Sequence, residues 1–243
     1  MKPEVLVFDD LEALSLSAAE RLGVVAREAV RGRGRFSLAL SGGHTPRRLY
    51  ALLAEGRAGD LPWDRIHLFW GDERFVPQSD PASNFRMVRE ALLERIPVPP
   101  GNLHPVPVCL GSPVEAAAAY ERELRAFFAS EGEPAFDLAL LGLGDEGHTA
   151  SLFPGSPALA ERHAWVAAAE AAPGIIPRSR ITLTLRGLSA ARAIWFLVAG
   201  AEKAPVVRIL VDGSEAEAAR LPAGRIGGAG PVTWFLDRAA RGY

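Results

Sequence analysis

The chain has 243 residues, of which 49% are hydrophobic and 23% charged, enough for one large domain or two small ones with a substantial core. Its formal net charge of -2 argues against a surface for nucleic acid or anionic membrane, which normally shows as a basic stripe. A single cysteine, Cys109, excludes an internal disulfide and offers no thiolate cage for a structural zinc.

The N-terminal residues do not resemble a targeting segment. Residues 1–10 become acidic too soon for a signal peptide, and no apolar run approaches the roughly 18 residues that cross a bilayer. We therefore expect a soluble, cytoplasmic protein without nucleic-acid or membrane partners. The sequence leaves the oligomeric state open, and a monomer is compatible with it.

Strands and helices alternate along the chain. Apolar segments predict strands at residues 5–8, 36–40, 66–70, 136–141, 165–168, 181–185, 194–198 and 232–236, with short extended pieces at 104–108. Capping signals predict helices that begin near Ser17, Thr45, Ser83, Ser112 and Ala201, and a helical stub at 237–241. The alternation predicts a single α/β domain over residues 1–243, with a mostly parallel sheet and helices on both faces.

Residues 136–154, FDLALLGLGDEGHTASLFP, join an apolar run to a polar turn. The run at 136–141 lies between a proline and a glycine, as expected of a strand that is buried on both faces. In open α/β sheets, ligands bind outside the carboxyl ends of the strands. Asp145, Glu146 and His148 fall at that position, so we predict a functional site here.

The glycines of this turn, Gly142, Gly144 and Gly147, also match the spacing of a dinucleotide site. That pattern must open a helix, whereas Pro154 and Pro157 follow within about ten residues. We therefore assign the glycines to a tight turn. The other histidines lack ligand spacing, and we infer neither a metal nor a cofactor.

His148 has a structural and a catalytic interpretation. A lone histidine is most often structural, but its position past the sheet edge favours a general base, because imidazole exchanges protons near neutral pH. Glu146, or less favourably Asp145, would then orient the imidazole and stabilise its protonated form.

The segment SGGHTP, residues 41–46, follows a predicted strand and opens a predicted helix. Its glycines leave backbone N–H groups open, and the helix N-terminus adds partial positive charge, which suits a phosphate. A plain strand-to-helix turn is one alternative. A nucleophile elbow with Ser41 attacking is another, although the helix signals at Thr45 and Pro46 come later than an elbow requires.

Four cationic side chains are candidates for binding an anion. Arg74, in the GDER segment after the strand at 66–70, has the fork geometry that matches phosphate. Arg178, Arg180 and Lys203 are the others. The alternatives are an ion-pair cluster on a solvated loop for Arg74 and a solvated helix terminus for Lys203.

Together these motifs resemble the 6-phosphogluconolactonase branch of the glucosamine-6-phosphate isomerase/6-phosphogluconolactonase family. SGGHTP, GDERFVP, LLGLGDEGHTASLFP, RITLT and AGAEKA occur in the order seen in that branch, and WFLDRAA extends the resemblance over nearly the whole chain. The deaminase branch typically continues after the histidine with Ile-Ala-Phe-Asn-Glu-Pro. Residues 149–154 read TASLFP instead and lack the Asn-Glu pair used in ring opening, which favours the lactonase.

The resemblance implies a Rossmann-like fold and hydrolysis of 6-phospho-D-glucono-1,5-lactone to 6-phosphogluconate in the pentose phosphate pathway. His148 would be the base and Glu146 its orienting carboxylate, although lactonases usually carry Pro-Asp where this chain has Asp145-Glu146. The substrate phosphate would be bound by Gly42, Gly43, Thr45, Arg74, Arg180 and Lys203. A sugar-phosphate isomerase or deaminase and a non-catalytic sugar-phosphate sensor are the alternatives.

Overall fold

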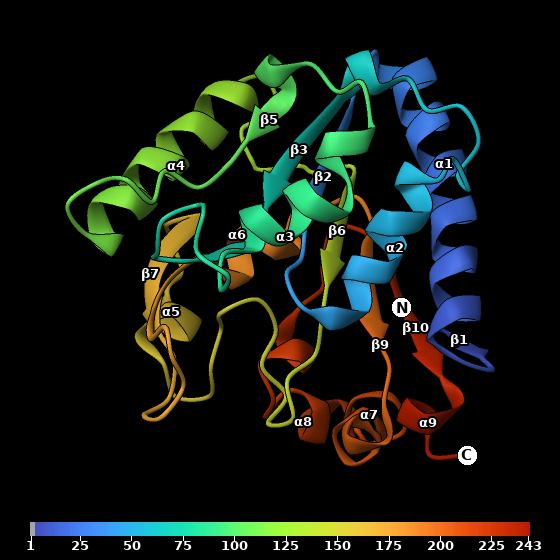
Figure 1. The fold of residues 1–243 in the computed structure, drawn as a ribbon. Coiled ribbons are helices and arrows are strands. Elements are labelled where there is room, and N and C mark those ends of the chain that lie inside the picture. Colours follow the sequence, from blue (N-terminus) through green and yellow to red (C-terminus); the bar gives the residue numbers. More distant parts are fainter. Residues whose placement is uncertain (1–2) are drawn as a thin grey trace.

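The computed structural model describes residues 3–243, which surround a central parallel sheet (Figure 1). Its seven strands lie in the order β1-β10-β9-β6-β2-β3-β5, and each neighbouring pair is parallel. Their bounds are β1 Glu4–Phe8, β2 Phe36–Leu40, β3 Ile66–Trp70, β5 Leu103–His104, β6 Leu138–Leu141, β9 Ile194–Val198 and β10 Val232–Asp237. The expected mostly parallel α/β fold is confirmed.

The order of the strands reverses near the middle of the sheet. From β2 the chain proceeds to β3 and then β5 on one side, whereas β6 leads to β9 and β10 on the other. In open α/β sheets a crevice forms at such a reversal, outside the carboxyl ends of the strands. The neighbouring strands β2 and β6 therefore mark where a ligand site is expected. Both are buried along their whole length, which explains why β6 is entirely apolar and why β2 is apolar except for Ser37.

Helices surround this sheet (Figure 1). They are α1 Leu11–Arg33, α2 His44–Ala54, α3 Asn84–Ala91, α4 Pro113–Phe127, α5 Pro157–Ala160, α6 Leu185–Ser189, α7 Ala204–Val211, α8 Glu215–Ala218 and α9 Arg238–Arg241. The predicted N-caps Ser83 and Ser112 are confirmed, because each side chain accepts a hydrogen bond from a backbone N–H of the first turn. Within residues 3–243, no helix is both long and apolar enough to cross a membrane.

One predicted helix start, near Ser17, and one predicted N-cap, Thr45, are wrong. The first helix begins at Leu11 rather than near Ser17, because Asp10 caps it by accepting a hydrogen bond from the N–H of Ala13. The second begins at His44 with Gly43 at its N-cap, so Thr45 lies inside the first turn and makes no capping bond. A proline is tolerated in that turn because its missing N–H would have no helical partner there.

A second, three-stranded antiparallel sheet lies beside the first. It comprises β4 Asp72–Arg74, β8 Ser179–Leu183 and β7 Val166–Glu170, in that order. β4 falls in the segment that the sequence assigns to a loop after β3. The pairing sets Arg74 opposite Arg180 and Asp72 opposite Thr182. This small sheet therefore brings distant polar residues to one side of the cleft.

Two histidines form a polar chain within an aromatic cluster. Nδ1 of His67 lies 3.1 Å from Nε2 of His104, whose Nδ1 lies 2.7 Å from a carboxylate oxygen of Glu123. Both rings pack against Phe127. Burial, with smaller effects of His104 and Arg35, lowers the pKa of His67 to about 4.

We expect His67 to make the fold sensitive to acid. Between its ordinary pKa of 6.5 and its folded pKa of about 4, the unfolded chain binds a proton that the folded protein excludes. Lowering the pH through this interval therefore favours unfolding. Thermal unfolding from pH 7 to pH 4.5 should show a smaller fall of Tm in His67→Phe, which keeps an aromatic ring, than in the wild type. Equal falls would contradict this role.

Candidate active site

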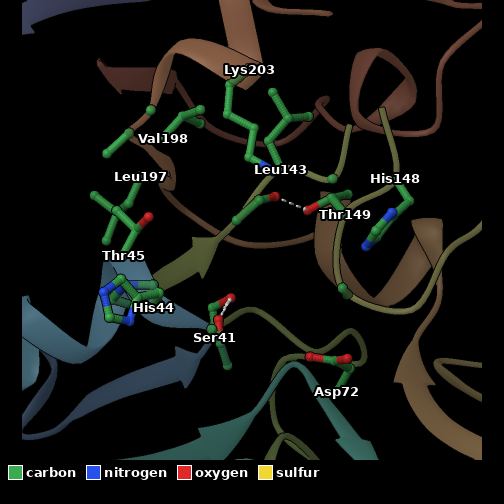
Figure 2. A pocket seen from close by; sticks show the side chains of 18 of the residues that line it. Ser41, His44, Thr45, Asp72, Leu143, His148, Thr149, Leu197, Val198 and Lys203 are labelled. Carbon is green, nitrogen blue, oxygen red and sulfur yellow. Dashed lines mark hydrogen bonds between the residues drawn. The ribbon is translucent and has the colours of Figure 1, made fainter. Parts of the chain in front are cut away.

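A cleft of about 610 Å³ opens at the predicted sheet edge. It lies past the carboxyl ends of β2, β3, β6 and β9, where the chain order reverses. Figure 2 shows His148 on one side of this cleft and His44 and Thr45 on the other. Of the predicted site residues, six line it: Gly42, Gly43, Thr45, Arg74, His148 and Lys203. Glu146 and Arg180 are not part of its lining.

The loop after β2 brings the N-terminus of α2 to the cleft. The backbone of Ser41 is held on both sides by the buried hydroxyl of Tyr50, which accepts from its N–H and donates to its carbonyl. Gly42 packs so closely that a Cβ there would lie 2.0 Å from Oδ1 of Asn84. Gly43 has a φ of 102°, a conformation that favours glycine. No side chain caps α2, and residues 43–46 line the cleft, so this helix N-terminus lies at the cleft without a side-chain cap.

A second buried tyrosine holds the end of β3 in the same way. The hydroxyl of Tyr120, on α4, accepts from the N–H of Trp70 and donates to its carbonyl. Burial raises the pKa of both Tyr50 and Tyr120, which keeps the hydroxyls protonated and able to donate. Two tyrosines thereby fix the strand ends from which the cleft loops depart.

A short hydrogen-bonded turn presents His148. The N–H of Gly144 donates to the carbonyl of His148 at 2.8 Å, and the N–H of Gly147 donates to the carbonyl of Gly144 at 2.9 Å. The imidazole lies 4.7 Å from the ring of Phe153, centroid to centroid. It also lies over Gly144, where an added Cβ would stand 2.0 Å from Nδ1. Gly144, within the glycine pattern of this turn, therefore makes room for the imidazole.

Glu146 approaches His148 from the solvent side. Its Oε1 lies 3.1 Å from Nδ1 of His148, with 45% of the glutamate and 26% of the histidine side chain exposed. The two atoms are within ion-pair distance but are not aligned as a hydrogen bond. The arrangement leaves Nε2 as the imidazole nitrogen not faced by this carboxylate.

The paired arginines of β4 and β8 have different environments. Arg74 lines the cleft and donates from Nη1 to the carbonyl of Ala82. Arg180 is only 6% exposed. Burial, and next the positive charge of Arg74, lowers the pKa of Arg180, whereas the carboxylates of Asp72 and Glu73 oppose that shift. Arg180 therefore adds a buried positive charge on the strand beside Arg74 and does not line the cleft.

Glu73 is a structural carboxylate at the start of α3. Its oxygens accept hydrogen bonds from the N–H groups of Arg74, Asn84 and Phe85. Burial raises its pKa, and these three bonds act in the opposite direction. Because the backbone donors surround the carboxylate, Glu73 fixes β4 against the helix instead of reaching the cleft.

Asp72 is a cleft residue to which the sequence assigns no specific role. It is 8% exposed, and its Oδ2 accepts from the hydroxyl of Ser151 at 2.7 Å. Asn84 donates to its backbone carbonyl at 2.9 Å, and Ser151 donates from its N–H to the hydroxyl of Thr182 at 3.2 Å. The network joins the small sheet to the segment after His148. A charged residue one glycine past the end of a mostly apolar strand is the signal that could have identified Asp72.

Lys203 reaches the cleft from the segment after β9 (Figure 2). Its side chain is 20% exposed, and its ammonium forms an ion pair with Asp145 of the histidine turn. A lysine at the start of α7 is thus held over the cleft by a carboxylate 58 positions away in the chain.

Two other chemistries find little support in this geometry. The hydroxyl of Ser41 donates to the carbonyl of Gly42, and no histidine is hydrogen-bonded to it within residues 3–243 (Figure 2). A serine nucleophile requires such a base. In the same part of the chain, no group of three or more histidine, cysteine, aspartate or glutamate side chains is arranged to hold a metal ion.

Comparison with known proteins agrees with the motifs. The model of the family described as glucosamine-6-phosphate isomerases/6-phosphogluconolactonase matches residues 9–234. The 6-phosphogluconolactonase of Synechocystis sp. is 41% identical over 244 residues, covering 99% of this chain and 98% of the relative. The crystal structure of 6-phosphogluconolactonase from Thermotoga maritima is 31% identical with a TM-score of 0.83, covering 98% of this chain and 100% of that one.

A more distant structure shares the fold alone. A monomeric glucosamine-6-phosphate deaminase is 23% identical and has a TM-score of 0.81, covering 98% of each chain. The fold of this chain is therefore also found in a deaminase. The two lactonases compared above have higher sequence identity to this chain than the deaminase has. The chain belongs to the glucosamine-6-phosphate isomerase/6-phosphogluconolactonase family.

Proposed function

We propose that the chain hydrolyses 6-phospho-D-glucono-1,5-lactone to 6-phosphogluconate, with His148 as the general base. The observation that carries the proposal is the position of His148 on a cleft that also contains a helix N-terminus and two cationic side chains. The full-length similarity to proteins named 6-phosphogluconolactonase supports this reaction. In a phosphorylated lactone, the ester carbonyl would face His148, and the phosphate would face the helix N-terminus and the two cationic side chains.

In the proposed reaction, a water molecule attacks the lactone carbonyl while the imidazole of His148 accepts its proton. The carbonyl carbon becomes tetrahedral and its oxygen becomes an anion. Collapse of this intermediate breaks the bond from the carbonyl carbon to the ring oxygen, and His148 returns the proton to that oxygen. The products are a hydroxyl and a carboxylic acid, so one water is consumed and no other reactant is needed.

The oxyanion would be stabilised by backbone N–H groups of the histidine turn. Two of these groups are already used, since Gly144 donates to His148 and Gly147 donates to Gly144. We therefore assign the role to the remaining N–H groups of residues 142–147. Glu146, at 3.1 Å from Nδ1, would stabilise the imidazolium that forms during attack.

The phosphate would bind between the loop after β2 and the cations. Gly42, Gly43 and Thr45 provide the helix N-terminus, while Arg74 and Lys203 provide charge from two other segments. Arg180 would strengthen the positive potential of this site from its buried position on the strand paired with that of Arg74. The small negative net charge of the chain is compatible with this arrangement because the positive potential is local.

We expect Arg74→Ala and Lys203→Met to raise KM much more than they lower kcat, because each removes a contact made equally in the ground and transition states. A charge-assisted hydrogen bond contributes about 1.5 to 3 kcal/mol, which corresponds to roughly ten- to a hundredfold in KM. Steady-state kinetics test this expectation. Arg178→Ala is the control, since Arg178 pairs with Glu170 away from the cleft lining. A loss confined to kcat would contradict the assignment.

Acid release from freshly prepared 6-phosphogluconolactone, above spontaneous hydrolysis, tests the proposed activity. The protein should accelerate hydrolysis and release no ammonia from glucosamine 6-phosphate. Ammonia release without lactone hydrolysis would instead support the deaminase alternative. Binding of 6-phosphogluconate without any acceleration would identify a sugar-phosphate sensor.

A further inference from the structure

Asp145 is a cleft-side carboxylate that the proposed mechanism leaves unused. It precedes Glu146, so two adjacent carboxylates of one turn face two different groups: Asp145 pairs with Lys203, and Glu146 approaches His148. Asp145 is 70% exposed, whereas the side chain of Lys203 is 20% exposed. The lysine stem is therefore largely covered, and its charged end is held at the surface of the cleft.

The turn does not need Asp145 for its own shape. Backbone bonds between Gly144 and His148 close it, and the hydroxyl of Thr149 donates to the carbonyl of Gly142 at 2.8 Å (Figure 2). The N–H of Ala223 also binds the carbonyl of Gly147 at 3.0 Å. Within residues 3–243, the contact with Lys203 is the one side-chain hydrogen bond of Asp145.

Lys203, in turn, depends on Asp145 for its position. The ammonium has no other hydrogen-bond partner within the described residues 3–243. A lysine side chain has several rotatable bonds, and ordering it when a ligand binds reduces affinity. An ammonium already fixed by Asp145 has two further N–H groups to offer an anion, so part of this ordering takes place before the ligand arrives.

We propose that Asp145 is a positioning residue that preorganises the Lys203 ammonium for the phosphate group of the substrate. The proposal rests on the proposed function for the identity of the substrate, but the interaction itself concerns any phosphate-bearing ligand in this cleft. Asp145 and the bound phosphate share the ammonium, and the repulsion between the two anions is screened by water because Asp145 is mostly exposed. We therefore expect preorganisation of the ammonium to outweigh this screened repulsion.

Removing the charge of Asp145 tests this role directly. In Asp145→Asn, the dissociation constant for 6-phosphogluconate, measured by calorimetry, should rise about three- to tenfold, the range expected for releasing one long side chain. KM for the lactone should rise by a similar factor, with kcat nearly unchanged because the histidine turn keeps its backbone bonds. Asp64→Asn, an exposed aspartate paired with Arg65 before β3, is the matched control and should leave both constants unchanged.

A double variant distinguishes the positioning of Lys203 by Asp145 from a general effect of removing the negative charge of Asp145. In the Lys203→Met background, Asp145→Asn should cause no further loss of affinity, since there is no ammonium left to position. An equal loss in both backgrounds, or tighter binding by Asp145→Asn alone, would overturn the proposal. If wild-type protein fails to hydrolyse the lactone while the calorimetric pattern holds, the proposed function fails and the positioning role stands.

Discussion

Replacing His148 by alanine is expected to lower kcat by about 10²- to 10⁴-fold, the usual contribution of a positioned general base. KM should change little, because the proposed phosphate contacts come from other segments of the cleft. The loss follows from the reaction itself: without an acceptor for its proton, water attacks the carbonyl as a weak nucleophile. Initial rates of acid release, corrected for spontaneous hydrolysis of the lactone, measure the effect.

The His148 experiment needs a control for folding and binding. His148→Ala should bind 6-phosphogluconate with nearly wild-type affinity, and its thermal unfolding should remain cooperative, since the histidine side chain is 26% exposed and its backbone bond to Gly144 persists. Turnover near the wild-type rate would exclude His148 as the base. Loss of binding together with turnover would point to a structural role instead.

Several strands and helix caps can be predicted from the sequence, because each depends on residues that lie within a few positions of one another. The strands at 36–40, 66–70 and 194–198 have the predicted bounds, since each is a short segment of mostly apolar residues whose hydrophobic pattern is visible in the local sequence. The caps Ser83 and Ser112 are likewise decided by a side chain and a backbone N–H three positions away. In each of these segments, local preference and tertiary structure agree.

The errors arise where two signals compete or where distant segments meet. Asp10 and Ser17 are both acceptable caps, and the buried positions that extend back to Leu14 favour the earlier start. β4 is too short to show a period, and only its pairing with β8 makes it a strand. That pairing also explains why Arg180, which looks like a cleft residue in the sequence, is buried. A helix cap can be predicted from neighbouring residues, but the pairing of two strands that are distant in the sequence cannot.

The sequence predicts where the site residues lie at the sheet edge, but it does not predict which side chains pair with one another. The places of His148 and of the loop after β2 can be predicted from the strand ends, because parallel strands present their carboxyl ends at one edge of the sheet. The pairing of Lys203 with Asp145 does not follow, since it joins loops after two different strands. The sequence prefers Glu146 over Asp145 as the partner of the histidine, and the structure brings Glu146 to 3.1 Å from it. Its orienting role stays a prediction.

Gly144 offers a way to move the imidazole without removing it. A Cβ at this position would lie 2.0 Å from Nδ1 and 2.1 Å from Cε1 of His148, well inside van der Waals contact. Gly144 is not among the glycines with positive φ, so alanine fits its backbone without strain. The imidazole is the end of a side chain and can rotate away. Gly144→Ala should therefore leave the protein folded and displace the base.

We expect kcat of Gly144→Ala to fall by about 10²-fold, because a displacement of roughly 1 Å in a reacting group can have that effect. Gly142→Ala is the matched control: it makes the same change in the same turn and keeps the backbone N–H of residue 142, while its Cβ would lie 3.7 Å from the hydroxyl of Ser41, an ordinary contact. Its turnover should stay close to that of the wild type. If both variants lose activity equally, the turn itself is responsible; if neither does, the position of the His148 ring does not limit the reaction. A loss specific to Gly144→Ala would connect the glycine pattern to catalysis through the imidazole it accommodates.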